Sequence, residues 1–224
     1  MRKICKMILY EQAHFVYNMG MEVRYLYEKN ETLSEILENS NGFLKTSEAA
    51  AAGISRTYLG EFVKRKKLTR VVRGLYVSED AWMDGMYVLQ ARFPNAVFSH
   101  ESSLYLLDLA AREPLRYSVT IKTGASATNL IKSGAKVYKI KDDLHMLGAT
   151  ELMTPAGHKV LAYGAERTIC DLVRSRAGIE IQDYQAAILG YVRMKNKDLG
   201  LLMHYAKMLR VEKILRSHLE VLIL

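Results

Sequence analysis

Seven positively charged side chains lie within twenty residues of this sequence, between Ser55 and Gly74, where Glu61 is the only negative residue. The resulting excess of six positive charges is most of the net charge of +8 carried by all 224 residues. Ammonium and guanidinium groups at this density bind phosphates, so the pattern favours a nucleic-acid partner over catalysis. The positive residues are Arg56, Lys64, Arg65, Lys66, Lys67, Arg70 and Arg73.

Residue patterns typical of enzymes are missing from the sequence. It has no Gly-rich phosphate motif, no serine nucleophile elbow and no spaced carboxylates suited to catalytic metals. Asp142-Asp143, flanked by lysines, is interpreted as a turn. Cys5 and Cys170 are the only cysteines and form no CxxC motif, so neither a disulfide framework nor a zinc site is predicted. We therefore predict a protein that is not an enzyme and that uses no metal or cofactor.

Two short helices and a hairpin are predicted to position the positive side chains. Thr46 is expected to cap an Ala-rich helix over 46–52, which Gly53 ends because glycine adopts the left-handed backbone easily. Ser55 is a good cap for a second helix that runs to about Lys66. Residues 68–72 and 75–77 then predict a hairpin with Arg73 at its tip. This order is typical of a winged helix-turn-helix.

The second helix of this window is amphipathic. Leu59, Phe62 and Val63 share one stripe and should face the core, which leaves Arg56 and Thr57 on the opposite face near the helix start. Side chains there meet base edges in the major groove, whereas the cluster at the far end suits phosphates. The alternative is that Lys64–Lys67 is only a solvated helix end. The predicted DNA-binding residues are Ser55, Arg56, Thr57, Tyr58, Lys64, Arg65, Lys66, Lys67, Arg70 and Arg73.

The whole chain is predicted to be α+β. Residues 1–29 are a lead-in of uncertain structure, 30–78 form the winged helix-turn-helix, and 79–224 form a second domain. In that domain we expect a helix from Ala81, capped by Asp80 and with Trp82 on its apolar side. A small mixed or antiparallel sheet and a helical bundle should complete it. The strands are expected near 96–99, 116–122, 136–141, 150–153 and 158–162, and the helices near 102–109, 165–176, 181–196, 198–209 and 211–223.

Two polar motifs in the second domain are open to more than one interpretation. His100-Glu101-Ser102 opens a helix directly after a strand, a place where sites often form, but capping by Ser99 and Glu101 explains it more simply. In the segment Ala165–Arg174, the alternating charges of Glu166, Arg167, Asp171 and Arg174 are expected to pair on the solvent face. Alternatively, Arg167 beside Thr168 could hold a phosphate. Residues 193–220 carry a further excess of four positive charges, which fits either DNA or another partner.

Several segments in this order resemble the AbiEi antitoxins of AbiE abortive-infection systems. They are residues 43–77, VFSHESSLYLLDL (97–109), YSVTI (117–121) and AERTICDLVR (165–174), and the resemblance covers roughly 33–210. It implies a bacterial type IV antitoxin in a phage-defence operon. Its winged helix would repress its own promoter at inverted repeats, and its C-terminal domain would counter an AbiEii toxin, a nucleotidyltransferase-like protein, without a stable complex. The base-reading helix would then be Ser55–Lys66 and the wing Leu68–Val77.

Two other functions remain open from the sequence. One is a DNA-targeted enzyme, or a degenerate nuclease or nucleotidyltransferase. The other is an adaptor that holds the toxin directly through its C-terminal helices. No run of 18 apolar residues and no signal-peptide pattern is found, so a cytoplasmic protein without a membrane partner is expected.

Overall fold

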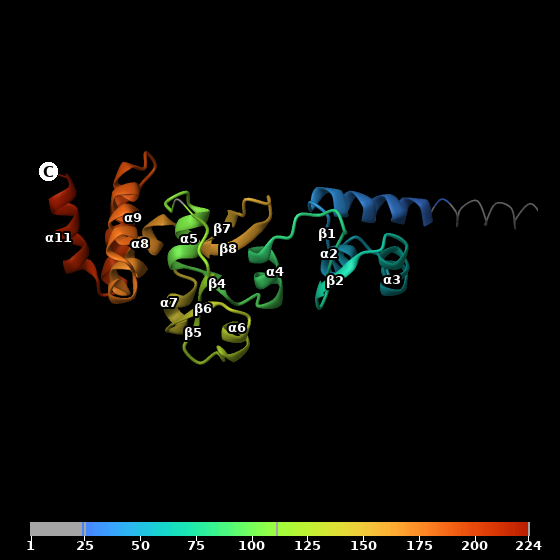
Figure 1. Ribbon diagram of the computed structural model, residues 1–224, viewed down its shortest axis with the longest axis horizontal. Helices are drawn as coiled ribbons and strands as arrows, with labels where there is room; N and C mark the ends of the chain where they lie inside the picture. Colours follow the sequence, from blue (N-terminus) through green and yellow to red (C-terminus); the bar gives the residue numbers. More distant parts are fainter. Residues whose placement is uncertain (1–23, 25, 111, 224) are drawn as a thin grey trace, which may run out of the picture. The chain divides into compact units, whose positions relative to one another are not determined.

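The computed structural model describes residues 24, 26–110 and 112–223. The chain divides into two compact units, one ending at Met83 and the other beginning at Asp84. We call them the N-terminal unit and the C-terminal unit (Figure 1). The described residues form helices and two β-sheets, which confirms the prediction of a mixed fold. Cys5 and most of the lead-in assigned to residues 1–29 lie outside the described residues.

The N-terminal unit combines helices with a three-stranded antiparallel sheet in which β3 lies between β1 and β2. The sequence predicted the hairpin of β2 and β3 but not β1, which pairs Phe43 with Val77. Thr46 was wrongly predicted to cap the first short helix, because Lys45 occupies the cap position and its side chain makes no capping bond. The elements are a helix over 26–39, β1 (Phe43–Lys45), α2 (Thr46–Ala51), α3 (Arg56–Arg65), β2 (Thr69–Val72) and β3 (Leu75–Val77).

The core of the N-terminal unit takes apolar side chains from each of its helices and from the sheet. Leu33 of the helix over 26–39, Leu44 of β1, Ala49 of α2 and Phe62 of α3 are all fully buried. The helices α2 and α3 contact each other, and the small side chain of Ala49 is part of their shared core. Burial of one stripe on α3 fixes which of its residues face outward.

A five-stranded sheet forms the centre of the C-terminal unit, with the strand order β6-β5-β4-β8-β7. It is mixed, because β4 pairs parallel with β8 and β5 parallel with β6, whereas the β4–β5 and β7–β8 pairs are antiparallel. The strands are β4 (Val97–Phe98), β5 (Ser118–Lys122), β6 (Lys136–Ile140), β7 (Ala149–Met153) and β8 (Lys159–Tyr163).

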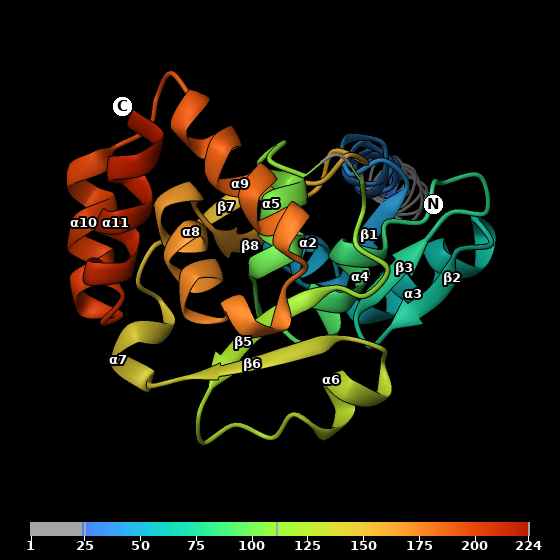
Figure 2. The same ribbon diagram turned by 60° about the vertical axis from the view of Figure 1, so that its left-hand side comes forward.

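Helices surround this sheet, and the last four lie together (Figure 2, orange to red). Of these, α8 contacts α5, α9, α10 and α11, so it is covered on several sides. The short helices α6 and α7 were not predicted, and Asp142-Asp143 begins α7 instead of forming a turn. The helices are α4 (Gly85–Arg92), α5 (His100–Leu106), α6 (Thr128–Lys132), α7 (Asp142–His145), α8 (Ala165–Arg174), α9 (Ile181–Arg193), α10 (Leu199–Met208) and α11 (Glu212–Ile223).

The helix predicted to start at Ala81 begins instead at Gly85, with Asp84 as its cap. Asp84 Oδ1 accepts the backbone N–H of Tyr87 at 3.0 Å, and Asp84 Oδ2 accepts hydrogen bonds from Thr154 at 2.6 Å and His158 at 2.8 Å. Thr154 and His158 lie at least 70 residues from Asp84 in the sequence. No local pattern shows these two bonds, so none could use them to favour Asp84 over Asp80. Trp82 therefore precedes the helix and is 85% exposed, contrary to its predicted apolar contact.

The prediction that the charges of α8 lie on its solvent face is wrong for Arg167 and Asp171. Both side chains are buried, and Arg167 Nε lies 3.0 Å from Asp171 Oδ2. Arg167 Nη1 also donates to the carbonyls of Leu144 at 2.8 Å and Leu147 at 2.5 Å, which replace water as acceptors. Burial raises the pKa of Asp171 to about 6, while Arg167 opposes the rise. The i+4 pairing was predicted correctly, but the neighbouring helices cover it.

Candidate nucleic-acid interface

The N-terminal end of α3 has the local structure that the sequence predicted. Ser55 is its cap, and Ser55 Oγ accepts the backbone N–H of Tyr58 at 3.3 Å. Leu59 and Phe62 are buried on one face, so Arg56 and Thr57 are exposed on the other. The cap fixes the direction in which the first turn points, and the backbone N–H groups of that turn add partial positive charge there.

The other end of α3 closes in a tight turn that spreads four cations into solvent. Lys67 has a φ of 53°, its N–H donates to Lys64 O at 3.2 Å, and Leu68 N–H donates to Val63 O at 2.9 Å. These two bonds are those of a Schellman motif, which usually has glycine where Lys67 stands. Leu68 is buried behind the turn, while Lys64, Arg65, Lys66 and Lys67 are all exposed.

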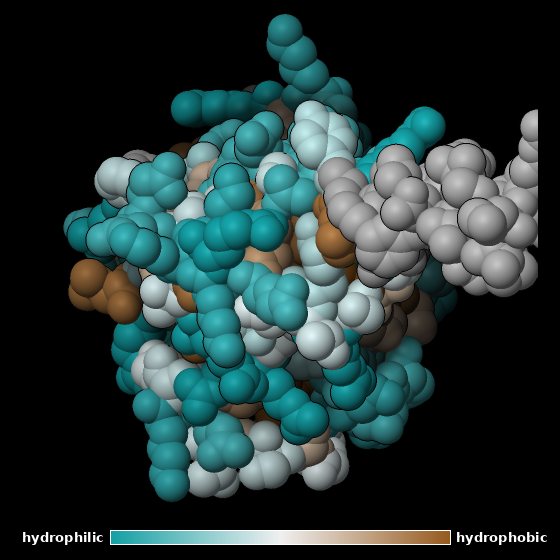
Figure 3. All heavy atoms as spheres, turned by 90° about the vertical axis from the view of Figure 1, so that its right-hand side faces the viewer, coloured by the Kyte–Doolittle hydropathy of each residue, from teal (hydrophilic) through white to brown (hydrophobic). Residues whose placement is uncertain are grey.

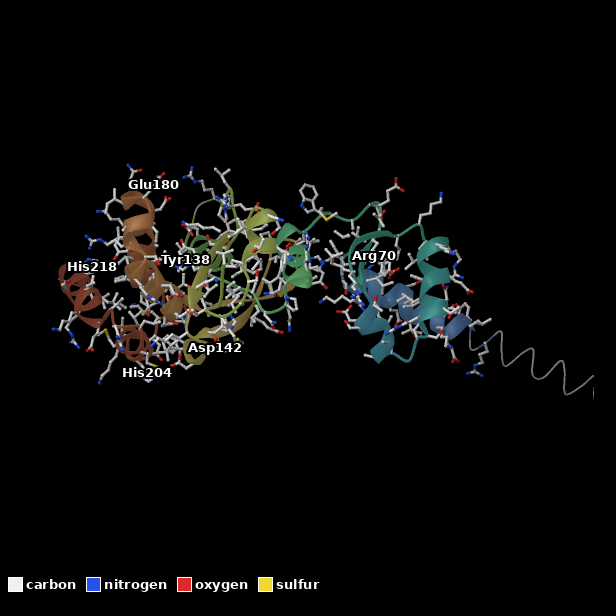
Figure 4. The ribbon with its side chains drawn as sticks, turned by 90° about the horizontal axis from the view of Figure 1, so that it is seen from below. Arg70, Tyr138, Asp142, Glu180, His204 and His218 are labelled. Carbon is white, nitrogen blue, oxygen red and sulfur yellow. The ribbon has the colours of Figure 1, made fainter. Side chains whose placement is uncertain are left out.

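The hairpin turn of β2 and β3 consists of Arg73 and Gly74, as predicted. Val72 pairs with Leu75, and Gly74 has the positive φ of 81° that this turn requires. Thr46 N–H donates to Gly74 O at 2.8 Å, which ties the hairpin tip to the start of α2. Arg70 on β2 (Figure 4) and Arg73 are both exposed. Hydrophilic side chains predominate on the face shown in Figure 3.

Two of the predicted DNA-binding residues contact the helix over 26–39. Tyr58 is half-buried, and its hydroxyl donates to Leu26 O at 2.9 Å, while Lys29 Nζ lies 5.7 Å from its ring centroid. Arg65 Nη2 donates to Asn30 Oδ1. Sequence reasoning missed Lys29 and Asn30, because no periodic signal linked this helix to α3. These contacts support α3 from one side and reduce the freedom of Tyr58 and Arg65.

The structure groups the predicted residues into two sets separated by the length of α3, which is roughly 15 Å for ten residues. Ser55, Arg56 and Thr57 lie at its start, and Lys64–Lys67 lie at its end. Donors and positive charge dominate both sets, which suits anion binding. Among the residues that the structure describes, no group of three His, Cys, Asp or Glu side chains is placed to hold a metal ion.

Residues 31–78, which contain all of these side chains, match a family model described as a transcriptional regulator, AbiEi antitoxin. This segment is similar to the AbiEi antitoxin family. The AbiEi segment includes most of the helix over 26–39 and continues through β3 to Ser78. The match confirms the resemblance to AbiEi antitoxins for residues 31–78, whereas the segments within 97–174 that also carried the resemblance lie outside the match.

Comparison with solved structures gives a weaker similarity. The crystal structure of the RV2827C protein from Mycobacterium tuberculosis is similar with a TM-score of 0.42 at 14% identity, over 79% of this chain and 74% of that one. No curated protein matches the sequence. Within the described part of the chain, no helix has the length and apolar character needed to cross a membrane.

The cap of α3 gives a direct stability test. Replacing Ser55 with alanine should lower the free energy of unfolding of the N-terminal unit by about 1 kcal/mol, because the N–H of Tyr58 loses its acceptor. Urea denaturation followed by far-UV circular dichroism measures this loss. Ser55→Asp, which restores an acceptor, should recover most of it; equal losses in both variants would argue against capping.

The unusual backbone of Lys67 gives a test in which stability and binding change in opposite directions. Lys67→Gly should raise the free energy of unfolding by about 1 kcal/mol, because glycine adopts a positive φ without strain. The same change removes one cation and should weaken DNA binding. Lys66→Gly is the matched control, since Lys66 has a φ of −84° and glycine relieves no backbone strain at that position. A less stable Lys67→Gly variant would contradict the prediction.

Proposed function

We propose that this protein is the antitoxin and transcriptional autorepressor of a phage-defence toxin–antitoxin operon of type IV. In this proposal, residues 30–78 act as a winged helix-turn-helix that binds inverted repeats in the protein's own promoter. Residues 79–224 counter a nucleotidyltransferase-like toxin in the cytoplasm without forming a stable complex with it. The match of residues 31–78 to the AbiEi antitoxin family supports both roles.

The observation that carries the DNA-binding part of the proposal is the exposure of all seven predicted cations. Lys64–Lys67 project from the end of α3, and Arg70 and Arg73 project from the adjacent hairpin. Neutralising phosphates releases counterions, so a cluster of this kind provides affinity that falls steeply with salt. On this basis α3 is the recognition helix and the hairpin of β2 and β3 is the wing.

Sequence preference is assigned to the first turn of α3. Arg56 can donate two hydrogen bonds to guanine, and Thr57 can bond a base or contact a thymine methyl group. Both side chains are exposed on the face opposite Leu59 and Phe62. In this assignment Tyr58 has a supporting role as well, because its hydroxyl is already bonded to the helix over 26–39.

The test is binding of the purified full-length protein to its own upstream promoter DNA at two salt concentrations. Scrambled DNA of equal length is the control, and DNA with one half of the inverted repeat removed tests whether both halves are used. Preference for the promoter, with affinity falling steeply as salt rises, supports the proposal. Equal affinity for promoter and scrambled DNA would reject specific repression.

The antitoxin part needs a separate readout. Co-expression with the neighbouring toxin gene should restore growth, and residues 79–224 should be required for the rescue. Neither protein should co-purify with the other, because a type IV pair forms no stable complex. Stable co-purification would favour the adaptor instead, in which the C-terminal helices hold the toxin directly.

A further inference from the structure

Two segments that lie 75 residues apart in the sequence meet inside the C-terminal unit. His100 begins α5, directly after β4, and Ser175 follows the last residue of α8. His100 Nε2 lies 3.1 Å from Ser175 Oγ, and His100 Nδ1 lies 3.0 Å from Ser99 Oγ. Thr120 of β5 also donates to Ser99 Oγ at 2.8 Å. The two polar motifs singled out in the sequence thus converge on one place.

His100 is held there in an unfavourable backbone conformation. Its φ is 51°, although it is not glycine, and such strain costs on the order of 1 kcal/mol and is common at functional sites. Its ring stacks on Tyr138 of β6, with the two ring centroids 3.5 Å apart. The side chain is 3% exposed, so its position is fixed by packing as well as by hydrogen bonds.

A serine hydroxyl beside an imidazole is also the arrangement of a nucleophile and its base. Burial, however, lowers the pKa of His100 to about 3, so the imidazole is a poor proton acceptor at neutral pH. Its partner at Nδ1 is a serine hydroxyl and not a carboxylate that could stabilise the imidazolium. This geometry therefore favours binding over hydrolysis.

The charges around this place favour an anion. Two nearby acidic residues are already paired with cations: Asp171 with the buried guanidinium of Arg167, and Glu101 with Lys136. Arg174 of α8 and Lys139 of β6 are exposed beside it, and neither makes an ion pair with any residue that the structure describes. Two uncompensated cations therefore border a buried polar floor.

A cavity of about 130 Å³ lies between these groups, which is room for several water molecules. His100, Thr120 and Asp171 form its buried floor, and Lys139, Arg174 and Ser175 stand at its edge. We propose that this cavity, here called the His100 pocket, binds a phosphate group. Arg174 and Lys139 supply the charge and Ser175 supplies a hydroxyl, independently of the function proposed for the N-terminal unit.

The phosphate could belong to a free nucleotide or to a nucleic-acid backbone, and calorimetric titration separates the two sources. The probes are inorganic phosphate, AMP and a short scrambled DNA duplex at constant ionic strength. The full-length protein is used with Lys64–Lys67 replaced by glutamine, so that the N-terminal cluster does not mask binding elsewhere. The test variant is Arg174→Gln with Lys139→Gln. The matched control is Arg176→Gln with Lys141→Gln, because these exposed cations lie two residues further along and outside the pocket.

At least one probe should bind the parent and the control, and about 10-fold or more weaker binding is expected for the test variant. Loss confined to AMP and inorganic phosphate assigns the pocket to a free nucleotide or phosphate. Loss confined to the duplex assigns it to a nucleic-acid backbone. The proposal is overturned if no probe binds, or if the test and control variants weaken binding equally.

Discussion

Replacing Lys64, Arg65, Lys66 and Lys67 together with glutamine should weaken promoter binding on the order of 100-fold at moderate salt. Each residue is exposed at the end of α3, and each phosphate contact that is lost removes a released counterion. The slope of log affinity against log salt should therefore become shallower by roughly three to four. Fluorescence anisotropy with labelled promoter DNA over a range of salt concentrations measures both quantities.

Two controls separate this effect from a general loss of charge or of structure. A variant with Arg92, Lys132, Lys141 and Arg176 replaced by glutamine loses the same charge from exposed positions of the C-terminal unit. Asn30→Ala removes the partner of Arg65 while keeping all four cations. The quadruple variant should bind promoter DNA more weakly than either control, and its affinity should depend less steeply on salt. If it binds promoter DNA as the charge-matched control does, then α3 is not the phosphate-binding element.

Replacing Arg167 with methionine should lower the free energy of unfolding of the C-terminal unit by about 3–5 kcal/mol. The change leaves the buried Asp171 carboxylate without its counter-charge and the carbonyls of Leu144 and Leu147 without a donor. Denaturant unfolding, with Arg174→Met as an exposed control on the same helix, measures the loss. A loss of less than 1 kcal/mol in the free energy of unfolding would contradict the prediction and would mean that water replaces the guanidinium.

The same variant should show a pH dependence of known sign. The pKa of Asp171 is already raised to about 6 in the folded protein, above its ordinary value of 3.8, and it should rise further without Arg167. A folded state that binds the proton more tightly gains stability as pH falls through the folded pKa. The deficit of Arg167→Met should therefore be smaller at pH 5 than at pH 8. Arg167→Met with Asp171→Leu should recover part of the loss and show a weaker pH dependence.

The sequence by itself determined the local structure of the candidate interface. Ser55 as a cap, Gly53 as a helix end and Arg73-Gly74 as a hairpin turn were all predicted, because each depends on neighbours within four residues. The period of the apolar residues in α3 likewise indicated which side chains face outward. The binding roles of those side chains stay predictions that the DNA experiments above test.

Only the tertiary structure decided which polar residues of the C-terminal unit are buried and what they contact. Arg167 and Asp171 have the spacing of an exposed ion pair, and only the helices packed around α8 remove them from water. Asp84, the cap of α4, is also held by partners at least 70 residues away, and His100 meets Ser175 across 75 residues. Caps and turns are short-range interactions that a sequence displays directly. Burial and convergence depend on contacts between distant segments, which exist only once the sheet and its helices have assembled.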